Sequence, residues 1–308
     1  MMYMDCLTPP PAPPPAQPSE ASTASTQYAK ILSMEKVQLP SLCEDCDKDR
    51  IVQFTEWIAA LVYSLLFVRP AKSVSIRCKL RAEMLRDAAM LMAETMVAMR
   101  THSSSVLQGL FYITRLNPEP TFDAEAEHSH QAVVSLLLRF FMLGTMLANK
   151  YLRDGKHKLT LWFEISDMVL ECDSGPPDDS ALEGDRGKED RYRKFLEVER
   201  AALAALNYKT LLPHLRWQSW LTQLITHPSL APFSKFHHGP VLSVLRCTLR
   251  ISRETFQVPS GAVLEPLDDL SPELVQEFRD KMIGDLELHR CSAPLPSPTI
   301  EKGPNQCL

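Results

Sequence analysis

The chain has little positive charge to offer an anionic partner. Its 33 lysine and arginine residues are outnumbered by 38 aspartate and glutamate residues, and the formal net charge is −5. Nucleic-acid binding therefore has no electrostatic support. The sequence also lacks the interleaved aromatic and basic residues that are typical of RNA-binding surfaces. We expect no nucleic acid among its partners.

Long apolar runs and a secretory leader are also missing. The longest apolar run, Ile58–Val68, contains Tyr63 and Ser64 and is too short to span a bilayer. Met1–Thr8 has neither the charged region nor the apolar region of a signal peptide. These absences predict an intracellular protein, in the nucleus, the cytoplasm or both, that does not bind membranes.

The motifs of common enzymes and metal sites are absent too. There is no glycine-rich phosphate loop, no HExxH and no GxSxG. The eight cysteines are scattered, and Cys43 and Cys46 form a lone CxxC without a second pair. His128 and His130 lie in a predicted loop without an acid at ligand spacing, so we expect them to be solvated. We therefore predict a protein that is not an enzyme and that has no cofactor, no metal and no small-molecule ligand.

Both ends of the chain are rich in proline and serine. Such segments cannot bury enough apolar surface to become ordered, so residues 1–40 and 291–308 are predicted to be disordered tails. Thr8-Pro9 and Ser297-Pro298 are dipeptides in these tails that a proline-directed kinase could modify, although such dipeptides also arise by chance. Between the tails, residues 41–212 and a C-terminal extension, 213–290, are long enough for one sizeable core.

Apolar residues recur at helical spacing along most of this region, which predicts an all-α fold. A capping box, Ser105 to Gln108, is expected to open one helix, and Ser271 is expected to cap another. The fold of residues 227–270 is the least defined, because Leu249–Ile251 could be helix or strand. The predicted helices are Ile51–Phe67, Ile76–Met99, Val106–Leu116, the central stretch ending near Arg153, Leu161–Leu170, Tyr192–Leu206, Pro213–Thr226, Pro240–Ile251 and Pro272–Leu288.

The central stretch, Arg139–Trp162, contains a helix that is apolar nearly all round. Such a helix lies inside a bundle rather than on its surface. Gly144 and Ala148 are small and four residues apart, so a neighbouring helix can approach closely there. Glycine inside a helix costs roughly 1 kcal/mol relative to alanine, which indicates a packing reason for Gly144.

The helix predicted over Tyr192–Leu206 carries a carboxylate on its apolar side. Phe195, Val198 and Ala202 belong to its apolar stripe, and Glu199 falls inside that stripe while Glu197 points away. A buried carboxylate needs a partner or costs several kcal/mol. The preceding segment, Glu171–Asp190, has eight acidic residues together with glycine and proline, and it is predicted to be a loop. It is either a tolerated insertion or an acidic contact arm.

Two of these stretches resemble one family. Ala148-Asn149-Lys150-Tyr151-Leu152, followed by Asp154 and Trp162, resembles the central helix and following turn of a cyclin box, above all in the fungal Pcl/Pho-type cyclins. Glu199-Arg200, with Leu203, Leu206, Asn207 and Tyr208, resembles the fifth helix of that box. The chain departs from the family at Leu159, where asparagine is usual, and in the length of the acidic segment. The resemblance covers about Ile51–Leu212.

The resemblance implies a single five-helix cyclin box that binds and activates a cyclin-dependent protein kinase. It implies that Lys150 and Glu199 pair at one end of the bundle, where both are partly exposed, and help to hold the kinase's regulatory helix. The alternative is that this pair serves only the fold. A different class of function, a helical scaffold or transcription cofactor without a kinase, would not need the pair.

A second hint comes from the helical wheel. Arg139 and Lys150 fall within about 20° of each other, and Leu143, Met142 and Met146 lie alongside them. This polar-ended strip on a core helix would suit a kinase-facing surface. It could equally line the edge of the bundle itself.

Overall fold

The computed structural model of the chain describes residues 48–68, 75–124, 128–152, 160–165, 184–226, 238–256, 264, 269–284 and 286. Nearly all of the regular structure in these residues is helical, which confirms the predicted all-α class. The helices are α2 (Lys48–Leu66), α3 (Ser75–Ala98), α4 (Ser103–Leu116), α5 (His130–Leu152), α7 (Gly184–Ala205), α8 (His214–Thr226), α9 (His238–Thr255) and α10 (Pro272–Ile283), and residues 160–165 are helical as well.

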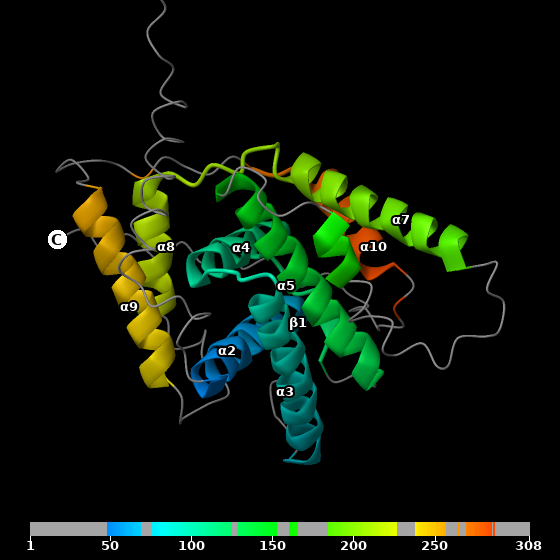
Figure 1. The fold of residues 1–308 in the computed structure, drawn as a ribbon, viewed down its shortest axis with the longest axis horizontal. Helices are drawn as coiled ribbons and strands as arrows, with labels where there is room; N and C mark the ends of the chain where they lie inside the picture. The colour runs from blue at the N-terminus through cyan, green and yellow to red at the C-terminus, as the bar shows by residue number, and fades with distance from the viewer. Residues whose placement is uncertain are drawn as a thin grey trace, which may run out of the picture.

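Helix α5 lies at the centre of this arrangement and contacts α2, α3, α4 and α10 (Figure 1). Apart from half-buried Arg139, every residue from Ala132 to Asn149 is buried. By length and composition His130–Lys150 could cross a membrane, but 89% of its most apolar part is buried inside the fold. The core helix of a bundle passes the same test, so this is weak evidence for a membrane span.

Helices α4 and α5 touch backbone to backbone at two glycines. A β-carbon on Gly144 would lie 2.7 Å from the carbonyl oxygen of Gly109, and one on Gly109 would lie 2.5 Å from the carbonyl carbon of Gly144. Neither distance leaves room for a methyl group. The prediction of a close helix contact at Gly144 is therefore confirmed, and its partner residue is Gly109.

The C-terminal helices share the same core. In Figure 1, α8 and α9 pack together on one flank, and α7 lies against α10 on the other. The indole Nε1 of Trp220 in α8 donates to the carbonyl oxygen of Leu107 in α4 at 3.3 Å, and its ring meets Phe111 edge to face. Val241 of α9 and Phe278 of α10 belong to the core cluster around α5. The extension is thus packed onto the bundle rather than separate from it.

The two strands in the described residues are very short. β1 (Phe67–Val68) pairs in parallel with β2 (Phe122–Asp123), so that Phe67 lies opposite Phe122. The sequence places Phe67 at a helix end and Phe122 in a polar loop. Both rings are 1% exposed and their centroids are 5.3 Å apart, so burial of the aromatic pair explains why this loop folds back onto α2.

The predicted capping box at the start of α4 is wrong. α4 begins at Ser103, and its N-cap is His102, which makes no capping hydrogen bond with its side chain. Ser105 and Gln108 are buried within the helix, and the Gln108 amide donates to the hydroxyl of Tyr112. The capping-box pattern fails here because the helix starts two residues before Ser105.

The loop predicted over the acidic segment is wrong for its last seven residues. Residues 184–190 form the first turns of α7 instead of a loop. Arg193 lies 4.0 Å from Glu189 and 3.6 Å from Asp190 on the same helix face. Such spacing supports a helix by a few tenths of a kcal/mol per pair, and acids near an N-terminus suit the helix dipole.

The last two helices differ from the predictions in extent. α9 is helical through Leu249 and Ile251, which settles the choice between helix and strand. The hydroxyl of Ser271 accepts from the backbone N–H of Leu274 and caps α10 as predicted, but that helix ends at Ile283 rather than at Leu288. The structure does not describe the two tails, Cys43, Cys46 or residues 166–183, so it does not test the predictions made for them.

Candidate functional site

The predicted ion pair between α5 and α7 is present. The ammonium nitrogen of Lys150 lies 2.6 Å from Oε1 of Glu199, across 49 residues of sequence. Lys150 lies in the last turn of α5, where a cation suits the dipole of the helix. The pair therefore joins the end of the central helix to the middle of α7.

The two side chains are not equally exposed. The side chain of Lys150 is 54% exposed, whereas that of Glu199 is 5% exposed. The prediction that both are partly exposed is wrong for Glu199. Its position among Phe195, Val198 and Ala202 explains the burial, because the apolar stripe of α7 packs inward and carries Glu199 with it.

This asymmetry assigns the two residues different tasks. A buried carboxylate without a partner is costly, so Lys150 stabilises Glu199 in the fold. An ammonium group has three N–H donors, and Glu199 accepts a hydrogen bond from one of them. Because Lys150 is half exposed, its other donors remain within reach of a molecule that docks at this end of the bundle.

Arg139 does not share in an open strip. Its Nη1 lies 3.3 Å from the carbonyl oxygen of Met282 and 3.4 Å from that of Ile283, the last residues of α10. Carbonyls at a helix C-terminus lack partners within the helix and carry the negative end of its dipole. Arg139 therefore caps α10 within the fold.

The apolar residues of the predicted strip are buried. Leu143 is 5% exposed, Met146 is 1% and Met142 is 3%, and all belong to the core cluster. This burial contradicts an open strip that faces a partner and favours the alternative, that these residues line the bundle itself. α10 packs on both α5 and α7, and the sequence gives no way to place it there.

Sequence reasoning missed the residue beside Lys150. Asn149 is 2% exposed, and within the described part of the chain neither its amide nitrogen nor its carbonyl oxygen has a hydrogen-bond partner. An unpaired buried amide costs roughly 1–3 kcal/mol. The signal in the sequence was a polar residue on an otherwise apolar helix. The cyclin-box resemblance included Asn149 but gave it no role.

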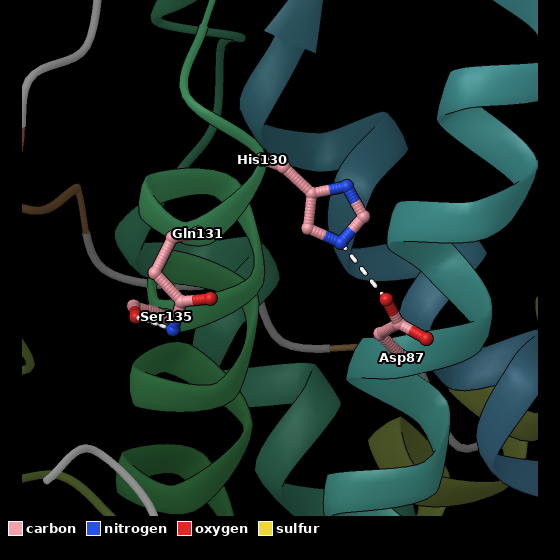
Figure 2. A network of polar contacts seen from close by, with 4 residues as sticks. All are labelled: Asp87, His130, Gln131 and Ser135. Carbon is pink, nitrogen blue, oxygen red and sulfur yellow. Dashed lines mark hydrogen bonds and ion pairs between the residues drawn. The ribbon is translucent and has the colours of Figure 1, made fainter. Parts of the chain in front are cut away.

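At the other end of α5, His130 has a partner that the sequence does not reveal. Figure 2 shows Nε2 of His130 pointing at Asp87 of α3, with 2.9 Å between nitrogen and carboxylate oxygen. His130 is solvated as predicted, with 42% of its side chain exposed, but it also has an acid partner that sequence spacing does not reveal, because that acid is 43 residues earlier in the chain. Both side chains are about half exposed, and exposed pairs contribute about 0–1 kcal/mol.

His128 is also engaged. Its Nε2 lies 2.5 Å from the carbonyl oxygen of Asp123, and its ring meets Phe67 edge to face. Among the described residues no group of histidine, cysteine, aspartate and glutamate side chains could hold a metal ion. The candidate site with a functional argument is therefore the half-open pair of Lys150 and Glu199.

Comparison of the chain with protein families, with curated proteins and with solved structures finds no match.

Proposed function

We propose that the chain is a cyclin-like regulatory subunit that binds and activates a cyclin-dependent protein kinase. The observation that carries this proposal is the pair of Lys150 and Glu199, in which a buried carboxylate holds a half-exposed ammonium at the end of the central helix. The resemblance of both surrounding segments to a cyclin box supplies the identity of the partner. The helical fold around α5 is compatible with such a box.

Lys150 is the contact residue in this proposal, and Glu199 is a positioning residue. Glu199 limits the conformations of a long, flexible side chain before the kinase arrives, which lowers the entropy cost of binding. The free N–H donors of Lys150 then hydrogen-bond to acceptors on the kinase's regulatory helix. Fixing that helix completes the Lys–Glu pair that kinases need for phosphoryl transfer.

The docking surface in this proposal is confined to the open end near Lys150. Leu143 and Met146 are buried, and Arg139 serves α10, so none of the three contacts the kinase. In this proposal the activation is allosteric: the chain changes the conformation of the kinase, and the kinase supplies the catalytic groups. A coupling of 1–3 kcal/mol would shift the kinase's equilibrium toward its active conformation about 5- to 150-fold. The rate would rise in proportion while that conformation is sparsely populated in the free kinase.

The burial of Glu199 also favours a second candidate. In a helical scaffold or transcription cofactor without a kinase, Lys150 would serve only to pair a carboxylate that the apolar stripe of α7 carries inward. The two candidates differ in what happens when both charges are removed together. The scaffold keeps its partners, whereas the kinase regulator loses its kinase.

Affinity purification of the tagged full chain tests the proposal, with the co-purified proteins identified by mass spectrometry. The informative variant is Lys150→Met with Glu199→Gln, which removes both charges and approximately keeps the side-chain volumes. We expect a cyclin-dependent kinase with the wild-type chain and at least tenfold less with this double variant.

The matched control is Lys281→Met with Glu197→Gln. These residues form another Lys–Glu pair, between Lys281 of α10 and Glu197 of α7, with 3.9 Å between nitrogen and oxygen. The control should retain the kinase. Absence of any kinase from the wild-type sample, or full retention by the Lys150 and Glu199 double variant, would contradict the proposal.

A further inference from the structure

The turn after α7 has an unusual backbone. The N–H of Asn207 donates to the carbonyl oxygen of Ala204 at 2.9 Å, and the N–H of Tyr208 donates to that of Leu203 at 2.8 Å. These two bonds define a Schellman cap, in which the residue at the position of Asn207 adopts a left-handed conformation. The φ of Asn207 is 52°, and asparagine tolerates this region well.

The cap does not account for Tyr208. Its φ is 55°, which is also left-handed, and for a bulky residue this places the β-carbon too close to a carbonyl oxygen. α3 ends in the same cap, with bonds from Arg100 to Val97 and from Thr101 to Met96. There only Arg100 is left-handed, with a φ of 46°. The second left-handed residue is therefore a property of the turn after α7 and not of the cap.

The side chain of Tyr208 is too exposed for packing within the fold to offset this strain. The residue after such a cap usually packs an apolar side chain back onto the helix, and Thr101 after α3 is accordingly 2% exposed. Tyr208 is 69% exposed, the largest value among the exposed large apolar residues that the structure describes. Among these described residues, no ring stacks on it.

The turn holds its shape through hydrogen bonds on both sides. The N–H of Lys209 donates to the carbonyl oxygen of Leu206, and that of Thr210 to Tyr208. From the core, the hydroxyl of buried Tyr112 donates to the carbonyl oxygen of Thr210 at 2.5 Å. The aromatic ring of Tyr208 is thus held in solvent by a rigid segment, at a cost to stability.

We infer that Tyr208 is a partner-contact residue of the same docking surface as Lys150, an inference that rests on the proposed function. Glu199 and the end of α7 are six residues apart, or about 9 Å along the helix. A standard interface covers about 800 Å² per partner and is about 30 Å across, so one partner spans both positions.

The chemistry favours a protein as this partner. Tyrosine combines a large rigid ring with a polar tip and is enriched among the residues that dominate protein interfaces. A net charge of −5 disfavours a nucleic acid that would stack its bases on the ring. Tyr208 would enter an apolar pocket on the kinase that has a hydrogen-bond acceptor at its mouth.

The backbone strain at Tyr208 and its proposed contact with the kinase predict opposite effects of one substitution, on stability and on affinity. Tyr208→Gly removes the ring and also removes the left-handed strain. We expect the Tm to stay level or rise by up to about 2–4 °C, while affinity for the kinase falls at least about tenfold. Asn207→Gly is the matched control in the same turn, and it should leave affinity unchanged. Tyr208→Phe keeps the ring and should retain most of the affinity.

The measurements are Tm by calorimetry and Kd by titration of the full chain against a panel of purified cyclin-dependent kinase subunits. A Tyr208→Gly variant that binds like the wild type would overturn the inference, and so would one with a lower Tm, because the ring would then be packed within the fold. If the wild type binds, the Lys150 and Glu199 double variant does not, and Tyr208→Gly does, only this inference fails. If the wild type binds no kinase, the proposed function fails and this inference with it.

Discussion

The carbonyl oxygen of Gly109 lies only 2.7 Å from the position that a β-carbon on Gly144 would occupy, because α4 and α5 touch backbone to backbone at these two residues. Any side chain at either position must push apart the two helices that make the largest contact in the bundle. The central helix is thereby fixed relative to α4, and with it the placement of Lys150 at its end.

Substitution of Gly144 by leucine should disrupt the fold itself. Overpacking a helix contact costs about 1–3 kcal/mol, and even Gly144→Ala should lower the Tm measurably, by about 2–4 °C per kcal/mol. Gly239→Ala is the control, because a β-carbon there meets nothing within 4 Å. A Gly144→Leu chain with the melting temperature of the wild type would show that the two helices do not touch at this point.

The pair of Lys150 and Glu199 should show strong thermodynamic coupling. Lys150→Met alone leaves a buried carboxylate without its partner, and we expect a loss of about 1–3 kcal/mol in the free energy of unfolding. Adding Glu199→Gln should recover most of that loss, because the charge is then gone. Urea titration of the two single variants and the double variant measures the coupling. Additive effects would mean that the two side chains do not interact.

Arg139 should matter for stability and not for binding. Arg139→Gln removes a cation from the C-terminus of α10, at a cost of about 0.3–2 kcal/mol. Affinity for the kinase should stay unchanged under conditions in which the variant is folded. Loss of binding without loss of stability would contradict this and would show that Arg139 contacts the kinase.

Folding should depend on pH through His214. Burial lowers the pKa of this side chain below its usual value of 6.5, and its ring stacks on Phe256 with 3.5 Å between centroids. The unfolded chain therefore binds a proton more readily than the folded one. The contribution of His214 to stability is complete above pH 6.5 and is lost as the pH falls below that value.

Comparison of the wild type with His214→Gln isolates this contribution. Unfolding by urea at a series of pH values from 7.5 to 5.0 should show a steeper loss of stability for the wild type than for the variant. Parallel curves would show that the ring titrates in the folded chain as it does in the unfolded one.

Local sequence patterns predicted most of the helices and placed Glu199 on the apolar side of α7, although the pair itself was expected to be partly exposed. Apolar periodicity located α5 and α7, and the wheel position of Glu199 was enough to require a cation, which the resemblance supplied as Lys150. The short range of these signals is also why other features escaped. The capping role of Arg139 depends on where α10 packs, and no local pattern in α5 specifies a helix more than a hundred residues later.

The acid beside His130 escaped for the same reason, since Asp87 is brought near only by the packing of α3 on α5. The start of α7 was missed because the glycine and proline in the acidic segment predicted a loop over its whole length, and the charge spacing that supports a helix was not considered. The strain at Tyr208 lies in its backbone angles, and a tyrosine after a helix gives no sequence signal of a left-handed conformation.

The most direct test of the central claim is the rate of phosphate transfer by a purified cyclin-dependent kinase that the chain binds. The rate should be measured for the kinase alone, with the wild-type chain, with the Lys150 and Glu199 double variant, and with the Lys281 and Glu197 control. We predict that the wild type and the control raise the rate by about 5- to 150-fold, and that the double variant, folded by circular dichroism, leaves it near the level of the kinase alone. Equal activation by the double variant and the wild type would contradict the claim that this pair is the site through which the chain acts.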